Sequence, residues 1–293
     1  MSGICTTLQA QTMLSGASAE AIQHHYDLSD EFYALWLDPT MTYSCALWDG
    51  ESDTLEAAQC RKLDWIAQQA LVGGARRVLD IGCGWGALLE RLVSTWGVAA
   101  GMGLTLSASQ QRHVAAKRLP GVEVRLESWA EHQAGTAYDA IVSVGAFEHF
   151  ARPGMSIEER QSAYRQFFST CRSMLPVGAP LVLQTIAYGS GAGATAAGQA
   201  FFGEVFPESE CPRLSEIVAA AEGLFELVVL RNDRPHYTRT LNAWLRNLKS
   251  HHARAVALVG SETVDFYKRY LRISAIGFHT KQRALLRMAW ARL

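Results

Sequence analysis

Three glycines at alternate positions, Gly82, Gly84 and Gly86, follow the apolar run VLDI, which contains Asp80. Glycine lets a backbone approach a ligand closely, and open α/β sheets bind their ligands at the carboxyl ends of their strands. A dinucleotide-binding turn would read GxGxxG, with an acidic residue roughly 20 positions later that holds a ribose. Here the spacing is GxGxG, and the next apolar run ends at residues 103–106 without an acid. The pattern therefore indicates a ligand-binding turn and disfavours NAD.

A carboxylate and an imidazole, Glu148 and His149, follow another apolar run, VSVGAF. If that run is a strand of the same sheet, its carboxyl end faces the same ligand as the glycine turn. Glu148 is then placed to take part in chemistry; the alternative is that the pair only caps the next segment. His24 and His25 have no partner at the spacing of a zinc site, so we expect a pair on a helix surface and no metal site.

These residues need alternating strands and helices to position them. Strands are expected at 76–82, 99–105, 122–128, 138–147 and 180–187, and helices at 86–96, 107–118 and 158–175. Such alternation predicts an α/β fold with a mostly parallel sheet and helices on both faces. We further expect strands at 225–233 and 236–244, the second leading into a helix, and a closing helical segment at 262–293.

The chain divides into three predicted parts. Residues 1–20 are small and polar and are expected to form a flexible tail. Residues 21–75 are expected to form a helical cap, in which Ser29 is the N-cap of a short helix and Thr54 begins a helix of about five turns. Residues 76–293 form the core, with a lid inserted at about 187–224.

The composition argues against several classes of protein. Lys and Arg number 27 and Asp and Glu 28, so a net charge of −1 creates no field that would attract nucleic acid. The 6 cysteines include no CxxC pair and the N-terminus lacks a signal-peptide pattern, which predicts reduced thiols and a cytoplasmic protein. The uncharged stretch between Arg172 and Glu204 contains prolines and a Gly/Ala/Ser run, so we expect no transmembrane segment there.

A series of motifs narrows the interpretation. In chain order they are HYDLSDEFY (25–33), LDPTMTYSCALW (37–48), TLEAAQCRKLD (54–64), VLDIGCGWG (78–86), GLTLSASQ (103–110), VSVGAFEHF (142–150), QTI (184–186) and PHYTRTLNAW (235–244). The glycine turn resembles the first motif of Rossmann-like S-adenosylmethionine methyltransferases. Together the motifs resemble the cyclopropane-fatty-acid synthase and mycolic-acid cyclopropane synthase family. The resemblance implies a Rossmann-like class I methyltransferase fold: a seven-stranded, mostly parallel sheet with an N-terminal helical cap and a helical lid.

The resemblance also implies S-adenosylmethionine as cofactor, with Trp129 beside its adenine. The implied pocket residues are Tyr43, Ser44, Asp80, Gly82, Gly84, Gly86, Thr105, Leu106, Gln110 and Trp129. Thr105 and Gln110 then make the polar contacts with the cofactor that the missing acidic residue would otherwise make. The family often has an acidic residue directly after the tryptophan; here Ala130 stands there, and Glu131 is its candidate replacement. Tyr43 and Trp129 have an alternative as ordinary core aromatics.

In this family a bound bicarbonate is taken as the base that removes a proton after methyl transfer. The implied catalytic residues are Cys45, Glu148, His149, Gln184, Ile186 through its backbone, and Tyr237. Gln184 replaces the usual histidine, and an amide hydrogen-bonds but does not titrate. Two expectations compete: bicarbonate is retained with the amide as donor, or Glu148 accepts the proton. Cys45 has an alternative as a small buried apolar residue.

The lid segment AYGSGAGATAAGQAFFGEV (187–205) is shorter and richer in Gly and Ala than the lids that enclose long acyl chains in the family. We therefore expect a C-methyltransferase that acts on an alkene or electron-rich carbon of an apolar acyl, polyketide-like or specialised-metabolite acceptor, carried on a protein, on a lipid, or free. The alternatives are a small-molecule N-methyltransferase and a non-catalytic cofactor-binding protein. The oligomeric state is left open, a homodimer included.

Overall fold

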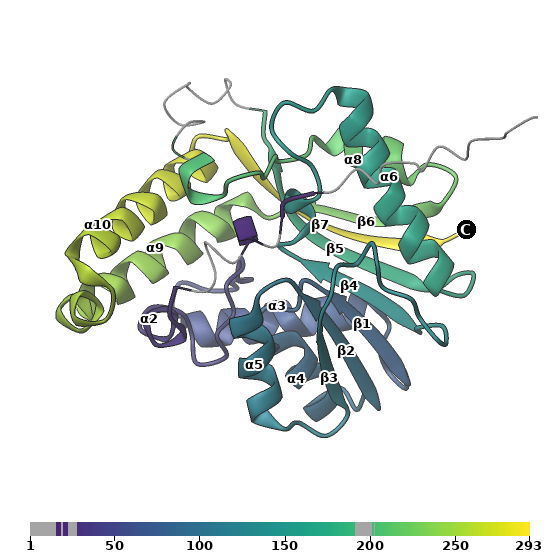
Figure 1. The fold of residues 1–293 in the computed structure, drawn as a ribbon, viewed down its shortest axis with the longest axis horizontal. Coiled ribbons are helices and arrows are strands. Elements are labelled where there is room, and N and C mark those ends of the chain that lie inside the picture. Colours follow the sequence, from purple (N-terminus) through teal and green to yellow (C-terminus); the bar gives the residue numbers. More distant parts are fainter. Residues whose placement is uncertain (1–15, 19, 23–27, 191–200, 202) are drawn as a thin grey trace, which may run out of the picture.

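The computed structural model describes residues 16–18, 20–22, 28–190, 201 and 203–293 (Figure 1). Its centre is a seven-stranded sheet of order β3-β2-β1-β4-β5-β7-β6. The strands are β1 (Arg77–Ile81), β2 (Ala100–Thr105), β3 (Val122–Leu126), β4 (Ala140–Val144), β5 (Pro180–Tyr188), β6 (Phe225–Asn232) and β7 (Arg283–Arg292). The strands pair in parallel except β7, which is antiparallel to β5 and to β6. The expected mostly parallel, seven-stranded sheet is confirmed.

Helices cover both faces of the sheet (Figure 1). One face carries α3 (Leu55–Gln69), α4 (Ala87–Ser94) and α5 (Ala108–Lys117), and the other carries α6 (Ile157–Met174) and α8 (Leu214–Ala221). Each face has its own apolar core: Ile66, Val78 and Leu92 belong to the first, and Phe147 and Phe167 to the second. Burial of these faces is the main term that holds such layers together.

A third group of helices, which we call the aromatic cap, covers the carboxyl ends of the parallel strands. It consists of α2 (Asp30–Ala34), α9 (Arg234–Ser250) and α10 (His252–His279). Rings of these helices share one core that includes Phe32, Trp244 and Tyr267, and Trp36, which follows α2, belongs to the same core. Ser29 is the N-cap of α2 and Thr54 that of α3, as the sequence predicts. The C-terminal helices thus complete a cap that the sequence assigns to the N-terminal region alone.

Two predicted elements are wrong. Residues 236–244, expected as a strand, belong to α9, whose first turn contains Pro235 and whose buried residues Tyr237, Leu241, Trp244 and Leu248 recur at helical spacing. The end of the expected closing helix, from 283 to 292, is strand β7 instead. β7 lies between two other strands and is buried on both faces along most of its length, so it lacks the alternation that identifies a half-exposed strand.

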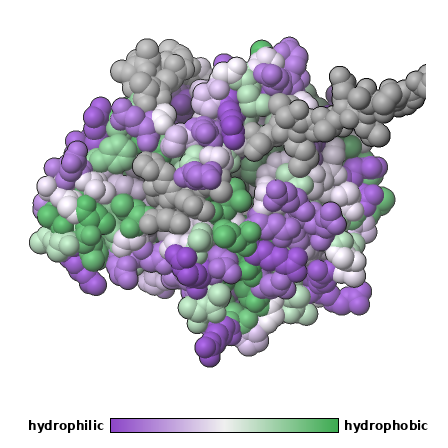
Figure 2. Space-filling model, in the orientation of Figure 1, coloured by the Kyte–Doolittle hydropathy of each residue, from purple (hydrophilic) through white to green (hydrophobic). Residues whose placement is uncertain are grey.

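Parts of the predicted tail and lid, residues 1–15, 19, 191–200 and 202, lie outside the described residues. The predicted helix-surface pair His24 and His25 also lies outside them. Within the described ranges, none of the helices has the length and apolarity that a membrane crossing requires. Figure 2 shows hydrophilic residues over much of one face, with apolar residues gathered where α9 and α10 meet.

Candidate active site

The glycine turn joins β1 to α4 at the carboxyl end of β1. Gly82, Gly84 and Gly86 have φ angles of 80°, 56° and 82°, in the left-handed region that favours glycine. A Cβ atom at Gly82 would lie 2.5 Å from that of Ala146, and one at Gly86 would lie 2.8 Å from Val114 Cγ2. A Cβ at Gly84 would meet nothing within 4 Å. Two glycines therefore permit close packing, and Gly84 keeps the space beside the turn open.

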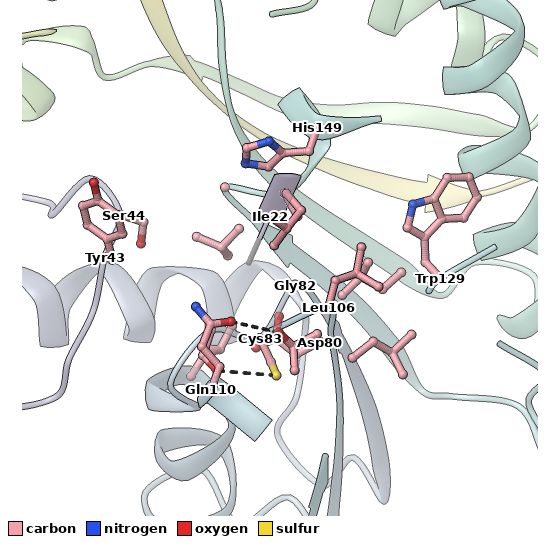
Figure 3. A pocket seen from close by; sticks show the side chains of 18 of the residues that line it. Ile22, Tyr43, Ser44, Asp80, Gly82, Cys83, Leu106, Gln110, Trp129 and His149 are labelled. Atoms are coloured by element: carbon pink, nitrogen blue, oxygen red, sulfur yellow. Dashed lines mark hydrogen bonds between the residues drawn. The ribbon is translucent and has the colours of Figure 1, made fainter. Parts of the chain in front are cut away.

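A first cavity of about 480 Å³ lies against this turn (Figure 3). Its lining includes these predicted cofactor residues: Tyr43, Ser44, Asp80, Gly82, Gly84, Thr105, Leu106, Gln110 and Trp129. Gly86 does not line it and instead precedes the first residue of α4. In Figure 3, Tyr43 and Ser44 lie on one side of the cavity and Trp129 on the other.

Polar groups of β2 and α5 meet in this cavity. The Thr105 hydroxyl donates to Gln110 Oε1 at 2.8 Å, and both residues are buried. Ser107 is the N-cap of α5 and accepts a hydrogen bond from the Gln110 backbone N–H at 3.1 Å. With its oxygen occupied, Gln110 has its amide NH₂ group to offer to a ligand.

Trp129 belongs to the core and to the cavity wall at once. Its ring packs on Phe150 and Phe167 with centroids 5.0 and 5.5 Å apart, while the residue also lines the first cavity. Ala130 and Glu131 line the same cavity. Trp129 can therefore be a core aromatic residue and also adjoin a ligand in the first cavity.

Lys62 of α3 is a cavity residue that the motifs do not reveal. It is 1% exposed, and its ammonium donates to Ser44 Oγ at 2.9 Å. Burial lowers the pKa of Lys62 to about 7, and burial raises the pKa of Asp80 to about 7, partly offset by Lys62. A signal was present, because Lys62 stands midway between Ala58 and Ile66 on the buried stripe of its helix.

A second cavity of about 410 Å³ adjoins the first. Tyr43, Ser44, Gly145 and His149 line both cavities. A ligand in one cavity and a ligand in the other are therefore neighbours across these residues. Such an arrangement suits the transfer of a small group from the first ligand to the second.

The second cavity contains most of the predicted catalytic residues: Glu148, His149, Gln184, Ile186 and Tyr237. Cys45 lines neither cavity and is fully buried. Its thiol donates to the Ala46 carbonyl at 3.2 Å, and burial raises its pKa to about 12. The structure does not bring the Cys45 thiol to the site, because it lies in the packing between the cap and the sheet.

Glu148 lies in the short helix η1 (Phe147–His149), directly after β4. Its Oε2 accepts a hydrogen bond from the Thr185 hydroxyl at 2.8 Å. Burial raises the pKa of Glu148 to about 7, although hydrogen bonds from Thr185 and from the backbone of Ile186 oppose the rise. The backbone of Ile186, which the resemblance assigns to the bicarbonate site, therefore interacts with the Glu148 carboxylate in this structure. A carboxyl group with this pKa exchanges a proton near neutral pH, as a general base must.

Aromatic rings enclose the second cavity. The Tyr237 and Phe278 rings lie 4.5 Å apart, and those of Phe206 and Tyr270 lie 5.8 Å apart. Burial lowers the pKa of His149 to about 4, so its ring is neutral at pH 7, and its Nδ1 lies 2.6 Å from Ser209 Oγ. Ring faces stabilise a cation, and a neutral imidazole does not repel one.

The sequence model of the family described as mycolic acid cyclopropane synthetase matches residues 15–288. The chain belongs to this family. Cyclopropane mycolic acid synthase 2 of Mycobacterium leprae (strain TN) is 35% identical over 273 residues, which cover 86% of this chain and 87% of that protein. The cyclopropane synthase MmaA2 from Mycobacterium tuberculosis has a similar structure, with a TM-score of 0.86 at 33% identity, covering 94% of this chain and 99% of that one.

The structure of the mycolic acid cyclopropane synthase CmaA1 complexed with SAH and CTAB is also similar, with a TM-score of 0.85 at 31% identity over 94% of this chain and 99% of that one. These matches confirm the family that the motifs indicate and the class I fold. They also confirm that this protein is an enzyme, an S-adenosylmethionine-dependent methyltransferase. Coclaurine N-methyltransferase has a TM-score of 0.79 at 19% identity, which shows a shared fold alone.

Proposed function

We propose that this enzyme transfers a methyl group from S-adenosylmethionine to an alkene or another electron-rich carbon of an apolar acceptor. The observation that carries the proposal is the pair of adjoining cavities. One cavity lies at the glycine turn, and the other combines aromatic rings with a buried carboxyl group. A dry, aromatic site with a base is what the carbocation left by alkene methylation requires.

The first cavity fits the cofactor in two respects. The space beside Gly84 is open, and Asp80 Oδ1 is buried without a hydrogen-bond partner among the described residues. A ligand ammonium or hydroxyl group would satisfy that oxygen. In this proposal Gly82 and Gly84 adjoin the methionine part and Trp129 the adenine. The cofactor supplies a methyl group already activated on a sulfonium.

In the second cavity the protein supplies the apolar walls and the proton acceptor. Tyr237, Phe206 and Tyr270 exclude water and face the developing cation, and Glu148 takes the proton or directs the base that does. We include bicarbonate in the proposal, because Glu148, Gln184 and Tyr237 share one cavity. The relative CmaA1 complexed with CTAB supports an apolar acceptor. A cytoplasmic location, a homodimer and a protein-bound or lipid-bound acceptor stay predictions.

The test is a screen of alkene and amine acceptors with cofactor deuterated at its methyl group, read by mass spectrometry. Methylated alkenes support the proposal. A product that retains all three deuterium atoms carries an intact branched methyl group. A product that has lost one deuterium is a cyclopropane or an isomeric methylene compound, and its NMR spectrum distinguishes these two. Methylated amines with unchanged alkenes would replace the proposal by N-methylation.

A further inference from the structure

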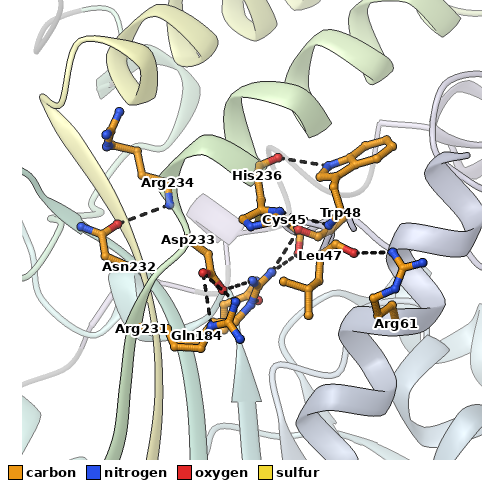
Figure 4. Close-up of polar contacts among 12 residues, drawn as sticks. Cys45, Leu47, Trp48, Arg61, Gln184, Arg231, Asn232, Asp233, Arg234 and His236 are labelled. Carbon is orange, nitrogen blue, oxygen red and sulfur yellow. Dashed lines mark hydrogen bonds and ion pairs between the residues drawn. The ribbon is translucent and has the colours of Figure 1, made fainter. Parts of the chain in front are cut away.

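A buried arginine stands directly behind the second cavity. Arg287 of β7 is 0% exposed, and in the antiparallel pairing of β5 with β7 it lies opposite Gln184. Opposite residues on antiparallel strands have their side chains on the same face. Figure 4 shows the polar contacts of this region, in which Gln184 and Asp233 lie close together.

Each nitrogen of the Arg287 guanidinium has a partner. Nε donates to Gln184 Oε1 at 2.7 Å, and one terminal nitrogen forms an ion pair with Asp233. The other terminal nitrogen donates to the carbonyl oxygens of Cys45 at 2.9 Å and Ala46 at 3.1 Å. The guanidinium therefore ties Gln184 of β5 to the segment between α2 and α3 that contains Cys45 and Ala46.

These contacts decide which way the Gln184 amide faces. A guanidinium only donates hydrogen bonds, so the amide must turn its oxygen toward Arg287 and its NH₂ group away. Gln184 is 1% exposed and lines the second cavity, yet its Nε2 has no hydrogen-bond partner among the described residues. A buried donor without an acceptor is costly, so an acceptor atom is expected there when the cavity is filled.

We propose that Arg287 is a positioning residue, which holds the Gln184 amide so that its NH₂ group donates to an oxygen atom bound in the second cavity. That oxygen belongs to a small planar anion or to a carbonyl group of the acceptor. The inference rests on the proposed function, because it takes the second cavity as the acceptor site. A histidine at position 184 could donate or accept, whereas this fixed amide only donates.

The sharpest test is Gln184→Glu, measured at pH 8. The substitution keeps the shape and one oxygen for Arg287, but it turns the donor toward the cavity into a second oxygen. We expect an unchanged or higher melting temperature, cofactor affinity within twofold of the wild type, and a loss of turnover of at least tenfold. Unchanged kcat and KM would overturn the proposal, because they would show that nothing accepts a hydrogen bond from this amide.

The role of Arg287 is tested by Arg287→Lys in two backgrounds. Lysine keeps a charge beside Asp233 but lacks the planar fork that also holds Gln184. We expect a several-fold fall in kcat in the wild-type background and no further fall in a Gln184→Leu background. Additive losses would mean that Arg287 acts only through packing, and would refute the positioning role.

Arg231→Gln is the matched control. Arg231 donates to Asp233 from the outer side at 3.1 Å, is 39% exposed in its side chain, and lines neither cavity. We expect its kcat and KM to stay within twofold of the wild type. A loss as large as that of Arg287→Lys would assign the effect to Asp233 rather than to the amide, and would overturn the proposal.

Added sodium bicarbonate separates the two sources of the oxygen. If it raises kcat of the wild type and not of Gln184→Glu, the oxygen belongs to the anion. If it has no effect and Gln184→Glu raises KM for carbonyl-containing acceptors more than for hydrocarbons, the oxygen belongs to the acceptor.

If the wild type methylates no alkene, the proposed function fails by itself. The Gln184 side-chain amide signal, assigned in a nitrogen-15 NMR spectrum by its absence in Gln184→Leu, then still tests the inference. A shift on addition of bicarbonate or of a carbonyl compound supports it, and no response to either overturns it.

Discussion

Replacing Glu148 with glutamine should stabilise the folded enzyme above neutral pH while it removes turnover. Burial raises the pKa of Glu148 from 4.5 to about 7, so the folded protein retains a proton that the unfolded chain has released. The pKa of Glu148 is higher in the folded protein than in the unfolded chain. The contribution of this carboxyl group to stability is therefore full below pH 4.5 and is lost as the pH rises to about 7. At roughly 1.36 kcal/mol per pKa unit, the loss is about 3 kcal/mol.

Glutamine has nearly the size of glutamate, and its amide oxygen can still accept the Thr185 hydrogen bond. It never ionises, so it does not carry this cost. We expect the free energy of unfolding of Glu148→Gln to exceed that of the wild type by up to about 3 kcal/mol at pH 8, with a much smaller difference near pH 5. Urea denaturation of both proteins at both pH values measures it.

Turnover should fall in the same variant by about 10²-fold or more, the usual contribution of a general base. Cofactor affinity should stay within twofold, since Glu148 does not line the first cavity. Equal unfolding free energies of variant and wild type at both pH values would show that the Glu148 carboxyl is not held protonated by burial. Unchanged turnover would remove Glu148 from the chemistry.

Three other measurements address the cofactor and the base. Gly84→Val should abolish binding of S-adenosylmethionine in calorimetry, because the branched side chain enters the open space and because the φ angle of +56° disfavours a branched residue. Gly73→Ala is the control and should bind the cofactor normally, because a Cβ atom at position 73 has no heavy atom within 4 Å. Trp129→Ala should weaken cofactor binding by about tenfold and change kcat at saturation little, the pattern of lost uniform binding. Removal of bicarbonate should lower the rate and its return restore it; an unchanged rate would leave Glu148 as the proton acceptor.

The fold was largely predictable from the sequence where its signals are local. Parallel strands such as β1 and β2 are short apolar runs between helices, and this alternation predicts a mostly parallel sheet. The pattern failed for β7, which lies between β5 and β6 in the sheet and is buried on both faces, and for the start of α9, whose aromatic and β-branched residues suit a strand. In both places tertiary packing, which the chain's local pattern does not contain, decides the structure.

The candidate site also combines residues that a local sequence motif reveals with residues that only the three-dimensional structure reveals. The glycine turn and the Glu148-His149 pair are continuous in sequence and could be recognised as motifs. Arg287 could not, because its contact with Gln184 depends on the pairing of strands 103 residues apart. Lys62 could have been found from the sequence, because it is a charged residue on the buried stripe of an amphipathic helix. The family motif that contains it does not single it out as a site residue.

The chemistry of position 184 makes the pH dependence of this enzyme interpretable. Gln184 does not titrate, burial moves the pKa of His149 to about 4 and that of Cys45 to about 12, and burial raises the pKa of Glu148 to about 7. Lys62 and Asp80 also have pKa values of about 7, but they line the cofactor cavity. Their titration should therefore affect kcat/KM for the cofactor, whereas kcat at saturating cofactor and a constant concentration of the bicarbonate ion should rise through the pKa of Glu148. A kcat that stays flat from pH 5 to pH 9 in the wild type would contradict this assignment.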